Sequence, residues 1–183
     1  AWAAPPPARG ADGMVRAPGV FSEDGPDPGS ALLAAALPEV LPARLADLGA
    51  GWGYLSAAAL TRRGVEHIDL VEAEAVSLDC ARVNVADPRA AFHWADATRW
   101  APEAPVGGVI CNPPFHIGRA ADPSLGRAFV AAAGRMLTRE GQLWLVANRS
   151  LPYEATLAET FRTVRELEGD RTYKLFHATR PRA

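Results

Sequence analysis

The chain reads LADLGAGWG at residues 45–53, and this stretch decides the fold. The apolar residues before the glycines predict a short buried strand, and the residues after Gly53 predict a helix. Glycines between a strand and a helix let the backbone turn tightly and let a ligand approach without a Cβ in the way, while the helix N-terminus offers free N–H groups. The stretch therefore predicts a nucleotide-type binding loop.

The residues of this loop indicate which class of nucleotide cofactor it could bind. The dinucleotide fingerprint needs glycine at the sixth position of the loop, where this chain has Tyr54. Asp47 stands just before Gly49, Gly51 and Gly53, and a carboxylate there suits the ammonium group of an amino-acid moiety better than it suits a pyrophosphate. The loop thus favours a cofactor that carries an amino acid, and a tight turn without any ligand is the alternative.

Outward from the loop, short apolar runs alternate with longer helical patterns, as is typical of a mostly parallel sheet with helices on both faces. The expected strands are 45–48, 67–71, 91–94, 106–111 and 142–147. The expected helices are about 53–63, 74–85, 124–138 and 153–162. Segments 163–167 and 171–178 predict an antiparallel hairpin that turns at Gly169-Asp170. Seven strands ending in such a hairpin indicate the Rossmann-like α/β fold of class I methyltransferases.

Residues 1–30 are rich in proline and glycine, which disfavours helix interiors and central strands. We expect a linker here that becomes an ordered leading loop near Val20-Phe21, followed by the catalytic domain over residues 31–183. Ser30 stands where an N-cap is expected, ahead of a short helix over 31–37 that Pro38 ends.

The composition limits the class of protein. A chain of 183 residues, about half of them apolar, suits one domain with a sizeable core. The formal net charge of -2 gives no electrostatic footprint for nucleic acid. Cys80 and Cys111 lack metal-ligand spacing, so we expect packing residues and no metal. No apolar run reaches the roughly 18 to 20 residues of a membrane span, and we expect a cytoplasmic protein.

Two acidic residues follow the second and third expected strands. Glu72 stands about 20 residues past the glycine loop, where a carboxylate can accept hydrogen bonds from both hydroxyls of a ribose. Glu74 is an alternative for that role. The Asp96 carboxylate can accept a hydrogen bond from an adenine amino group, and the backbone N–H of Ala97 can donate one to the adenine ring. An ordinary solvated acid at Glu72 and a turn former at Asp96 are the alternative interpretations.

The most informative motif is Asn112-Pro113-Pro114-Phe115, at the end of a buried apolar run. Each proline disfavours helical geometry in the residue before it, so Asn112 and Pro113 are held extended. A base or amide amine is a poor nucleophile because its lone pair is delocalised. If the Asn112 side-chain oxygen and the Pro113 carbonyl accept its two hydrogens, the lone pair turns towards an electrophilic methyl group. Phe115 can stack on the flat ring. A Pro-Pro turn with a packed Phe is the alternative.

We expect S-adenosylmethionine as the methyl donor, because methyl transfer from a sulfonium needs no metal and no covalent intermediate. Methylation of an amine can release its proton to water, so we expect a structural or substrate-edge role for His116. The remaining histidines are expected to pack or to lie on the surface: His67, His93 and His177. Four tryptophans have apolar neighbours and are expected to pack: Trp52, Trp94, Trp100 and Trp144.

The chain resembles the small-subunit (16S) ribosomal RNA methyltransferase C family over nearly its whole length from Pro18 onward. The residues that carry this resemblance are Pro18-Gly19-Val20-Phe21-Ser22, Asp27, Gly29, Ser30, Leu32-Leu33, the glycine loop, residues 112–116, Val146-Ala147-Asn148 and Leu151-Pro152-Tyr153.

The resemblance implies methyl transfer from S-adenosylmethionine to the exocyclic N2 amine of a guanine in 16S ribosomal RNA. It implies that Asp47, Gly49, Gly51 and Glu72 hold the cofactor and that residues 112–115 hold the target base. The family usually has Asp at position 72 and Cys at position 50, where this chain has Glu and Ala. It also implies an additional N-terminal domain that engages RNA, of which we expect no more than the first 17 residues here.

Other functions stay open at this point. The Asn-Pro-Pro-aromatic motif is shared with methyltransferases that act on adenine N6 and on protein glutamine, so it specifies chemistry rather than substrate. Large-subunit ribosomal RNA is another candidate substrate beside the 30S subunit. From a different class, the chain could be a non-catalytic cofactor domain that scaffolds ribosomal partners, but an intact glycine loop and an intact residue 112–115 motif argue against such decay.

Overall fold

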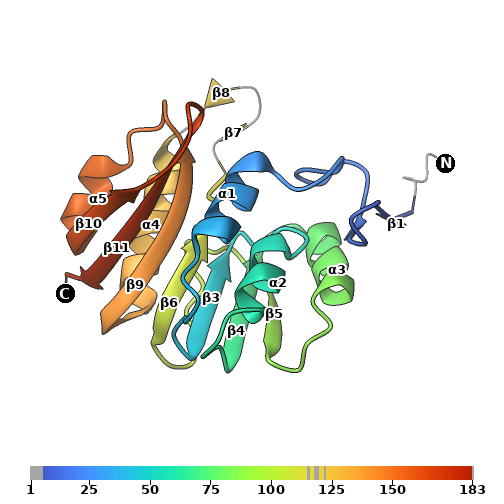
Figure 1. The fold of residues 1–183 in the computed structure, drawn as a ribbon, viewed down its shortest axis with the longest axis horizontal. Helices are drawn as coiled ribbons and strands as arrows, with labels where there is room; N and C mark the ends of the chain where they lie inside the picture. Colours follow the sequence, from blue (N-terminus) through green and yellow to red (C-terminus); the bar gives the residue numbers. More distant parts are fainter. Residues whose placement is uncertain (1–5, 115, 118–119, 122, 183) are drawn as a thin grey trace.

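The computed structural model describes residues 6–114, 116–117, 120–121 and 123–182. At its centre is a seven-stranded sheet in the order β10-β11-β9-β6-β3-β4-β5, seen along its width in Figure 1. Its strands are β3 (Arg44–Leu48), β4 (His67–Glu72), β5 (Ala90–Trp94), β6 (Val106–Cys111), β9 (Leu137–Asn148), β10 (Phe161–Leu167) and β11 (Tyr173–Pro181). Strands β3, β4, β5, β6 and β9 are parallel, and β11 is antiparallel to both of its neighbours.

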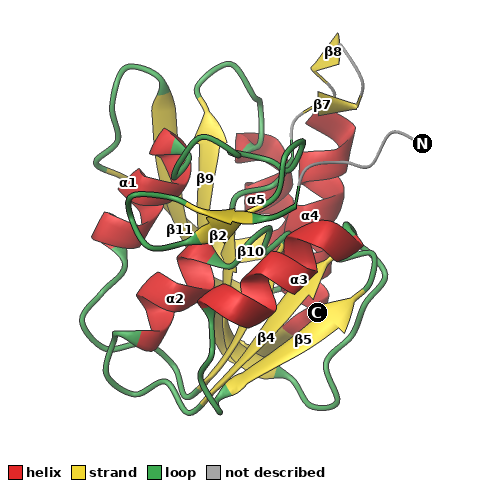
Figure 2. Cartoon of the chain, turned by 90° about the vertical axis from the view of Figure 1, so that its right-hand side faces the viewer, coloured by secondary structure: helices red, strands yellow, loops and turns green. Residues whose placement is uncertain are grey.

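Helices cover both faces of the sheet. One face carries α1 (Pro28–Ala36), α2 (Tyr54–Leu60) and α3 (Ala75–Asn84), and the other carries α4 (Pro123–Met136) and α5 (Glu154–Thr160), as Figures 1 and 2 show. The sheet's alternating side chains divide the core accordingly. Leu45, Ile68 and Leu70 belong to the cluster on the α1–α3 side, while Ala46 and Val71 belong to the cluster on the α4–α5 side.

The expected α/β fold and its C-terminal hairpin are confirmed. Every expected strand and helix is present with boundaries that differ by a few residues, and the largest difference is β9, which begins at Leu137 instead of residue 142. That strand pairs with β11 along residues 142–148, and its register with β6 shifts between Val106 and Gly108. Among the described residues, no helix is both long enough and apolar enough to cross a membrane.

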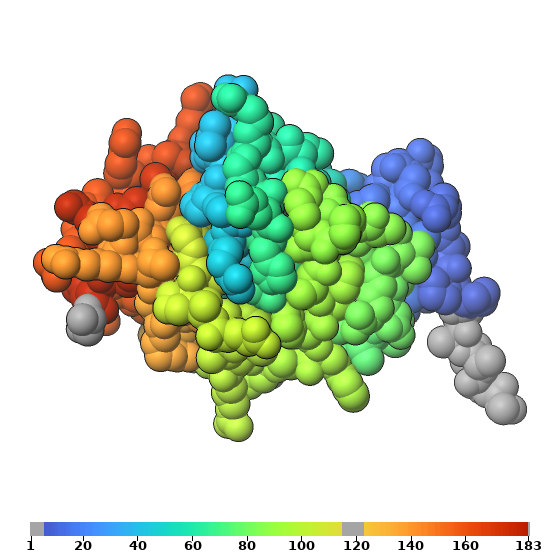
Figure 3. Space-filling model, turned by 90° about the horizontal axis from the view of Figure 1, so that it is seen from below, coloured from blue at the N-terminus to red at the C-terminus, as the bar shows by residue number. Residues whose placement is uncertain are grey.

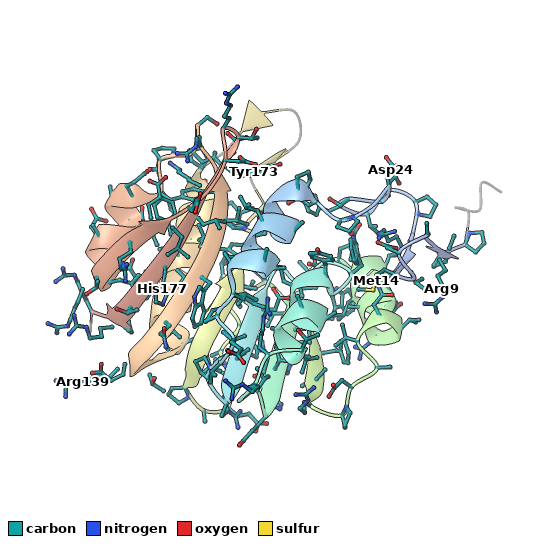
Figure 4. The ribbon with its side chains drawn as sticks, viewed as in Figure 1. Arg9, Met14, Asp24, Arg139, Tyr173 and His177 are labelled. Atoms are coloured by element: carbon teal, nitrogen blue, oxygen red, sulfur yellow. The ribbon has the colours of Figure 1, made fainter. Side chains whose placement is uncertain are left out.

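The beginning of the chain packs on the domain. Strands β1 (Ala8–Arg9) and β2 (Val15–Arg16) form a small hairpin, where the composition predicted a linker. Asn84, the last residue of α3, explains the difference: its Oδ1 accepts from the N–H of Val15, and its Nδ2 donates to the Val15 carbonyl at 2.8 Å. Figure 3 shows this N-terminal segment against the α3 region, and Figure 4 places Met14 there. The boundary at residue 30 stays a prediction.

The leading helix begins earlier than expected. Asp27, not Ser30, is the N-cap of α1, and its Oδ2 accepts from the Ser30 N–H at 2.8 Å. Pro28 occupies the first helical position, where its fixed φ and missing N–H are tolerated. The helix ends at Ala36, before Pro38, as expected. A second small ladder, β7 (His116–Ile117) with β8 (Ala120–Ala121), lies between β6 and α4 in the chain.

Candidate active site

The strand order places a crevice at the carboxyl ends of β3 and β6. From β3 the chain moves to β4 and β5 on one side of the sheet and later to β6 and β9 on the other. Open α/β sheets bind ligands at such a switch point, outside the carboxyl ends of the strands. Leu48 and Cys111 are register partners at the ends of these two strands, so the glycine loop and Asn112 leave the sheet side by side.

Two cavities meet at this crevice. The larger, of about 320 Å³, extends from the glycine loop past Glu72 and Asp96 to the residue 112–114 segment. The smaller, of about 40 Å³, lies between the glycine loop, the first turn of α1 and Trp52. Four residues line both cavities and mark their common waist: Phe21, Gly49, Gly51 and Asn112.

The three loop glycines have positive φ angles, of 72° at Gly49, 55° at Gly51 and 90° at Gly53. Such angles favour glycine, and they explain the spacing. A Cβ on Gly51 would meet nothing within 4 Å, because this residue faces the open cavity. A Cβ on Gly53 would lie 2.7 Å from Cγ2 of Val85. Gly49 and Gly51 therefore line the site, whereas Gly53 lines neither cavity and lets α2 begin against α3.

The Glu72 carboxylate ties the end of β4 to the glycine loop. Its Oε2 accepts from the Gly51 N–H at 2.8 Å, and its Oε1 accepts from the Glu74 N–H at 2.8 Å. Both glutamates line the larger cavity. The conformation of the glycine loop therefore depends on Glu72 at the end of β4. The sequence spacing between the loop and Glu72 did not show this contact.

Asp96 and Ala97 also line the larger cavity. Oδ1 of Asp96 accepts from the backbone N–H of Thr98 at 2.8 Å and from its hydroxyl at 2.6 Å. These bonds from Thr98 lower the pKa of Asp96, so the carboxylate is ionised at neutral pH. Asp96 is thus a turn former and a cavity residue at once, and the two interpretations of its position are compatible.

Asp47 lies elsewhere than expected. It is fully buried and lines neither cavity. Its Oδ2 accepts from the Ser56 hydroxyl at 2.7 Å, which links β3 to α2, and Oδ1 has no hydrogen-bond partner within the described part of the chain. Burial raises the pKa of Asp47 to about 7. A direct contact with an ammonium group stays a prediction.

Asn112 lies at the waist with a defined amide orientation. Its Nδ2 donates to Oδ2 of Asp27 at 2.9 Å and to Oγ of Ser30 at 2.8 Å. A carboxylate only accepts hydrogen bonds, so the atom of Asn112 that faces it must be the amide nitrogen. Oδ1 is therefore the atom left for a ligand. Pro113 and Pro114 line the larger cavity beside it. Phe115 lies outside the described residues, as does the side chain of His116.

Comparison with known proteins identifies the family. Residues 13–177 match the family model described as methyltransferase small domain. The chain belongs to this family. It is 35% identical over 159 residues to the ribosomal RNA small subunit methyltransferase C of Shewanella piezotolerans and 34% identical to that of Shewanella pealeana, and each match covers 86% of this chain and 46% of the relative. The chain thus spans about half the length of the curated relatives it matches.

Solved structures agree with this methyltransferase fold. The T. thermophilus 16S rRNA N2 methyltransferase, solved in complex with AdoMet and guanosine, superposes with a TM-score of 0.76 at 30% identity over 95% of this chain and 49% of that one. The ribosomal protein L11 methylase of Lactobacillus delbrueckii shares the fold alone, with a TM-score of 0.63 at 18% identity over 83% of this chain and 76% of that one.

Several residues of the methyltransferase site were not expected there from the sequence. Asp27 and Ser30 belong to the segment that resembles the methyltransferase C family, but their contact with Asn112 spans 85 and 82 residues of chain. Leu125 and Phe129 form the α4 wall of the larger cavity. The residues around α4 carry no motif, so only the packing of the helix against the loop could have shown this role.

The cysteines and most aromatic residues lie as expected. Cys80 and Cys111 are buried free thiols, and burial raises the pKa of both. Trp52 and Trp144 are buried. Trp94 was expected to pack but is 71% exposed, because it is the last residue of the edge strand β5; its Nε1 donates to the Ala73 carbonyl at 2.8 Å.

The histidines also agree with packing or surface roles. His67 and His93 both face Oδ1 of Asp69, at 3.1 and 2.8 Å, and His177 stacks on Trp144. Within the described residues, no group of three or more His, Cys, Asp or Glu side chains is arranged to hold a metal ion.

Proposed function

We propose that this methyltransferase domain transfers a methyl group from S-adenosylmethionine to the exocyclic N2 amine of a guanine in 16S ribosomal RNA. The observation that carries the proposal is the amide of Asn112, which presents Oδ1 at the waist where the two cavities meet. Support for the substrate comes from relatives named as small-subunit methyltransferases and from a structure solved with AdoMet and guanosine.

The residues present fit this cofactor. Gly49 and Gly51 line the larger cavity and carry no Cβ, so a ligand can approach the backbone closely at these two positions. We propose that Glu72 accepts hydrogen bonds from the ribose hydroxyls, and that Asp96 and the Ala97 N–H receive the adenine. The bond between Asp47 and Ser56 holds α2 against β3 behind the loop.

The donor, when bound, supplies an electrophilic methyl group on a sulfonium. The chain's own residues prepare the amine. Oδ1 of Asn112 and the carbonyl of Pro113 accept its two hydrogens, which frees the lone pair to face the methyl group, while Pro114 keeps the segment rigid. We assign stacking of the guanine ring to Phe115. The proton leaves to water after transfer, so no general base is required.

RNA binding needs more than this domain supplies. The net charge is -2, whereas proteins that bind RNA unaided usually carry a strongly basic surface. The curated relatives are about twice as long as the match. We propose that an additional domain shares the contact with RNA or with the 30S subunit, and that the enzyme works in the cytoplasm.

The test is methyl transfer from labelled S-adenosylmethionine to unmethylated 30S subunits, followed by nucleoside analysis. Label in N2-methylguanine supports the proposal. Label in 50S RNA, in adenine N6 or in a glutamine side chain instead would overturn the substrate assignment. Calorimetry with S-adenosylhomocysteine addresses the scaffold alternative, because a non-catalytic module with a decayed site would bind none.

The role of Asn112 is tested by Asn112→Ala. We expect the rate of transfer to fall by about 100-fold or more, since both the positioned acceptor and the amine alignment are lost. The dissociation constant of S-adenosylhomocysteine should change by less than about 3-fold, because this role is realised only with the amine present. Equal losses in both measurements would show that Asn112 holds the cofactor rather than the target amine.

A further inference from the structure

Asp27 makes two hydrogen bonds through a single oxygen. Its Oδ2 accepts from the Ser30 N–H at 2.8 Å, which caps α1, and from Nδ2 of Asn112 at 2.9 Å. The first bond is structural. The second joins the leading segment to the residue on which the proposed function depends, 85 positions further along the chain.

We propose that Asp27 is a positioning residue for methyl transfer, which holds the Asn112 carboxamide in the one orientation that presents Oδ1 to the target amine. This inference rests on the proposed function. An asparagine amide has nearly the same shape after a half turn, but the turn exchanges an acceptor for a donor. A donor at the waist would repel the amine hydrogens instead of accepting them.

The carboxylate is what distinguishes the two orientations. With the amide reversed, Oδ1 of Asn112 would stand where Nδ2 now stands, 2.9 Å from a carboxylate oxygen, and neither atom could donate. Ser30 also contacts Nδ2, at 2.8 Å, but a hydroxyl can donate as well as accept and therefore tolerates both orientations. Of these two partners of Nδ2, Asp27 is therefore the one that discriminates between the orientations.

The bond also changes the acceptor strength of Asn112. A hydrogen bond from an amide N–H to a carboxylate is charge-assisted and stronger than one between neutral groups. Hydrogen bonds in series polarise one another, so electron density drawn towards Oδ1 makes that oxygen a better acceptor for the amine.

The fold holds Asp27 firmly in place. Pro28 begins the helix, and Gly29 fits beneath Tyr173 of β11, since a Cβ at this position would lie 2.9 Å from Cε1 of the tyrosine and 3.0 Å from Oδ2 of Asp27. Ser30 is only 7% exposed. Burial and the nearby Asp27 raise the pKa of Tyr173. Figure 4 shows Tyr173 at the same end of the sheet as the first turn of α1.

The decisive variant is Asp27→Asn. Asparagine caps helices as well as aspartate does, so α1 should remain intact. Its amide, however, can offer either an oxygen or an N–H to Asn112, and the preference for one orientation is lost. We expect the transfer rate to fall by about 10- to 100-fold, with the S-adenosylhomocysteine dissociation constant and the melting temperature close to wild type. Asp24→Asn is the matched control, since it makes the same charge change at an exposed position of the same segment.

Exchanging the amide and the carboxylate between positions 27 and 112 separates a positioning role of Asp27 from a purely structural one. Asn112→Asp alone places two carboxylates against each other and should be the least active single variant. In the double variant Asp27→Asn with Asn112→Asp, the amide donates and the carboxylate accepts, and a carboxylate presents an acceptor whichever way it turns. We expect the double variant to be at least about 10-fold faster than Asn112→Asp. Activity no better than that of Asn112→Asp, or a wild-type rate for Asp27→Asn, would overturn the inference.

Side-chain amide spectra provide a readout without substrate. In the wild-type protein the ¹⁵N–¹H signals of the Asn112 amide should be shifted by the charge-assisted bond and should exchange slowly with water. Asp24→Asn should show the same signals. In Asp27→Asn the shift and the slow exchange should both be lost. If the wild type transfers no methyl group to RNA but these signals behave as expected, the substrate assignment fails while the orientation holds. If transfer occurs and the signals of wild type and Asp27→Asn are the same, only the positioning role fails.

Discussion

Replacing Asp47 by asparagine should remove a pH dependence of stability that the wild-type protein carries. Asp47 is completely buried between β3 and α2, and burial raises its pKa from an ordinary value of 3.8 to about 7. The folded protein therefore binds this proton more tightly than the unfolded chain does. The resulting stabilisation is fully present below pH 3.8 and is lost as the pH rises through 7.

The size of the effect follows from the two pKa values. At pH 5 the folded-state proton stabilises the protein by about 2.7 kcal/mol relative to the ionised side chain, and at pH 8 by roughly 0.1 kcal/mol. The difference of about 2.6 kcal/mol is an upper value, since a buried carboxylate can be relieved by local relaxation. Asp47→Asn also buries an amide NH2 group between β3 and α2, but that cost is the same at every pH.

Urea unfolding of the wild type and of Asp47→Asn at pH 5, 6, 7 and 8 measures this difference. Subtracting the two curves cancels every other titrating group, and Asp24→Asn, the same substitution at an exposed position, serves as the control. We expect the wild type to lose stability relative to Asp47→Asn by up to about 1.4 kcal/mol per pH unit below pH 7, with little change above pH 7. A difference between the two proteins that stays constant from pH 5 to pH 8 would refute the reasoning.

Three further predictions concern packing and the site. Gly126→Ala should lower the free energy of unfolding by about 1 to 3 kcal/mol in urea titrations, because its Cβ would lie 1.9 Å from Oη of buried Tyr153, while Gly25→Ala, with open space around it, should be neutral. Asn84→Ala should release the β1–β2 hairpin, so that limited proteolysis cuts before residue 20 at least several times faster than in the wild type. An unchanged cleavage rate would show that the hydrogen bonds between Asn84 and Val15 do not hold the hairpin in place. Glu72→Gln should weaken S-adenosylhomocysteine binding by about 10-fold in calorimetry, since an acceptor for ribose or for the loop becomes a donor, and unchanged affinity would exclude Glu72 from the site.

The parts of the fold that depend on local pattern could be read from the sequence. Apolar runs of strand length, separated by helical periods, were sufficient to locate the seven strands of the central sheet along the chain, because burial on both faces of a parallel sheet demands such runs. The glycines of the loop carried a conformational requirement that φ values of 72° and 55° at Gly49 and Gly51 bear out. The strand-end positions of Glu72, Asp96 and Asn112 likewise placed all three at one edge of the sheet.

Only the tertiary structure decided which side chains at that edge contact one another and how exposed each of them is to solvent. No spacing rule connects Asp27 to Asn112, since hydrogen bonds across 85 residues exist only after α1 docks on the sheet. Asp47 and Asp96 look alike as acids near strand ends, yet one is sealed behind α2 with a pKa of about 7 and the other stays ionised at the cavity. Periodicity reports which residues are apolar along one element, whereas the partner and the solvation of a polar group depend on every element packed around it.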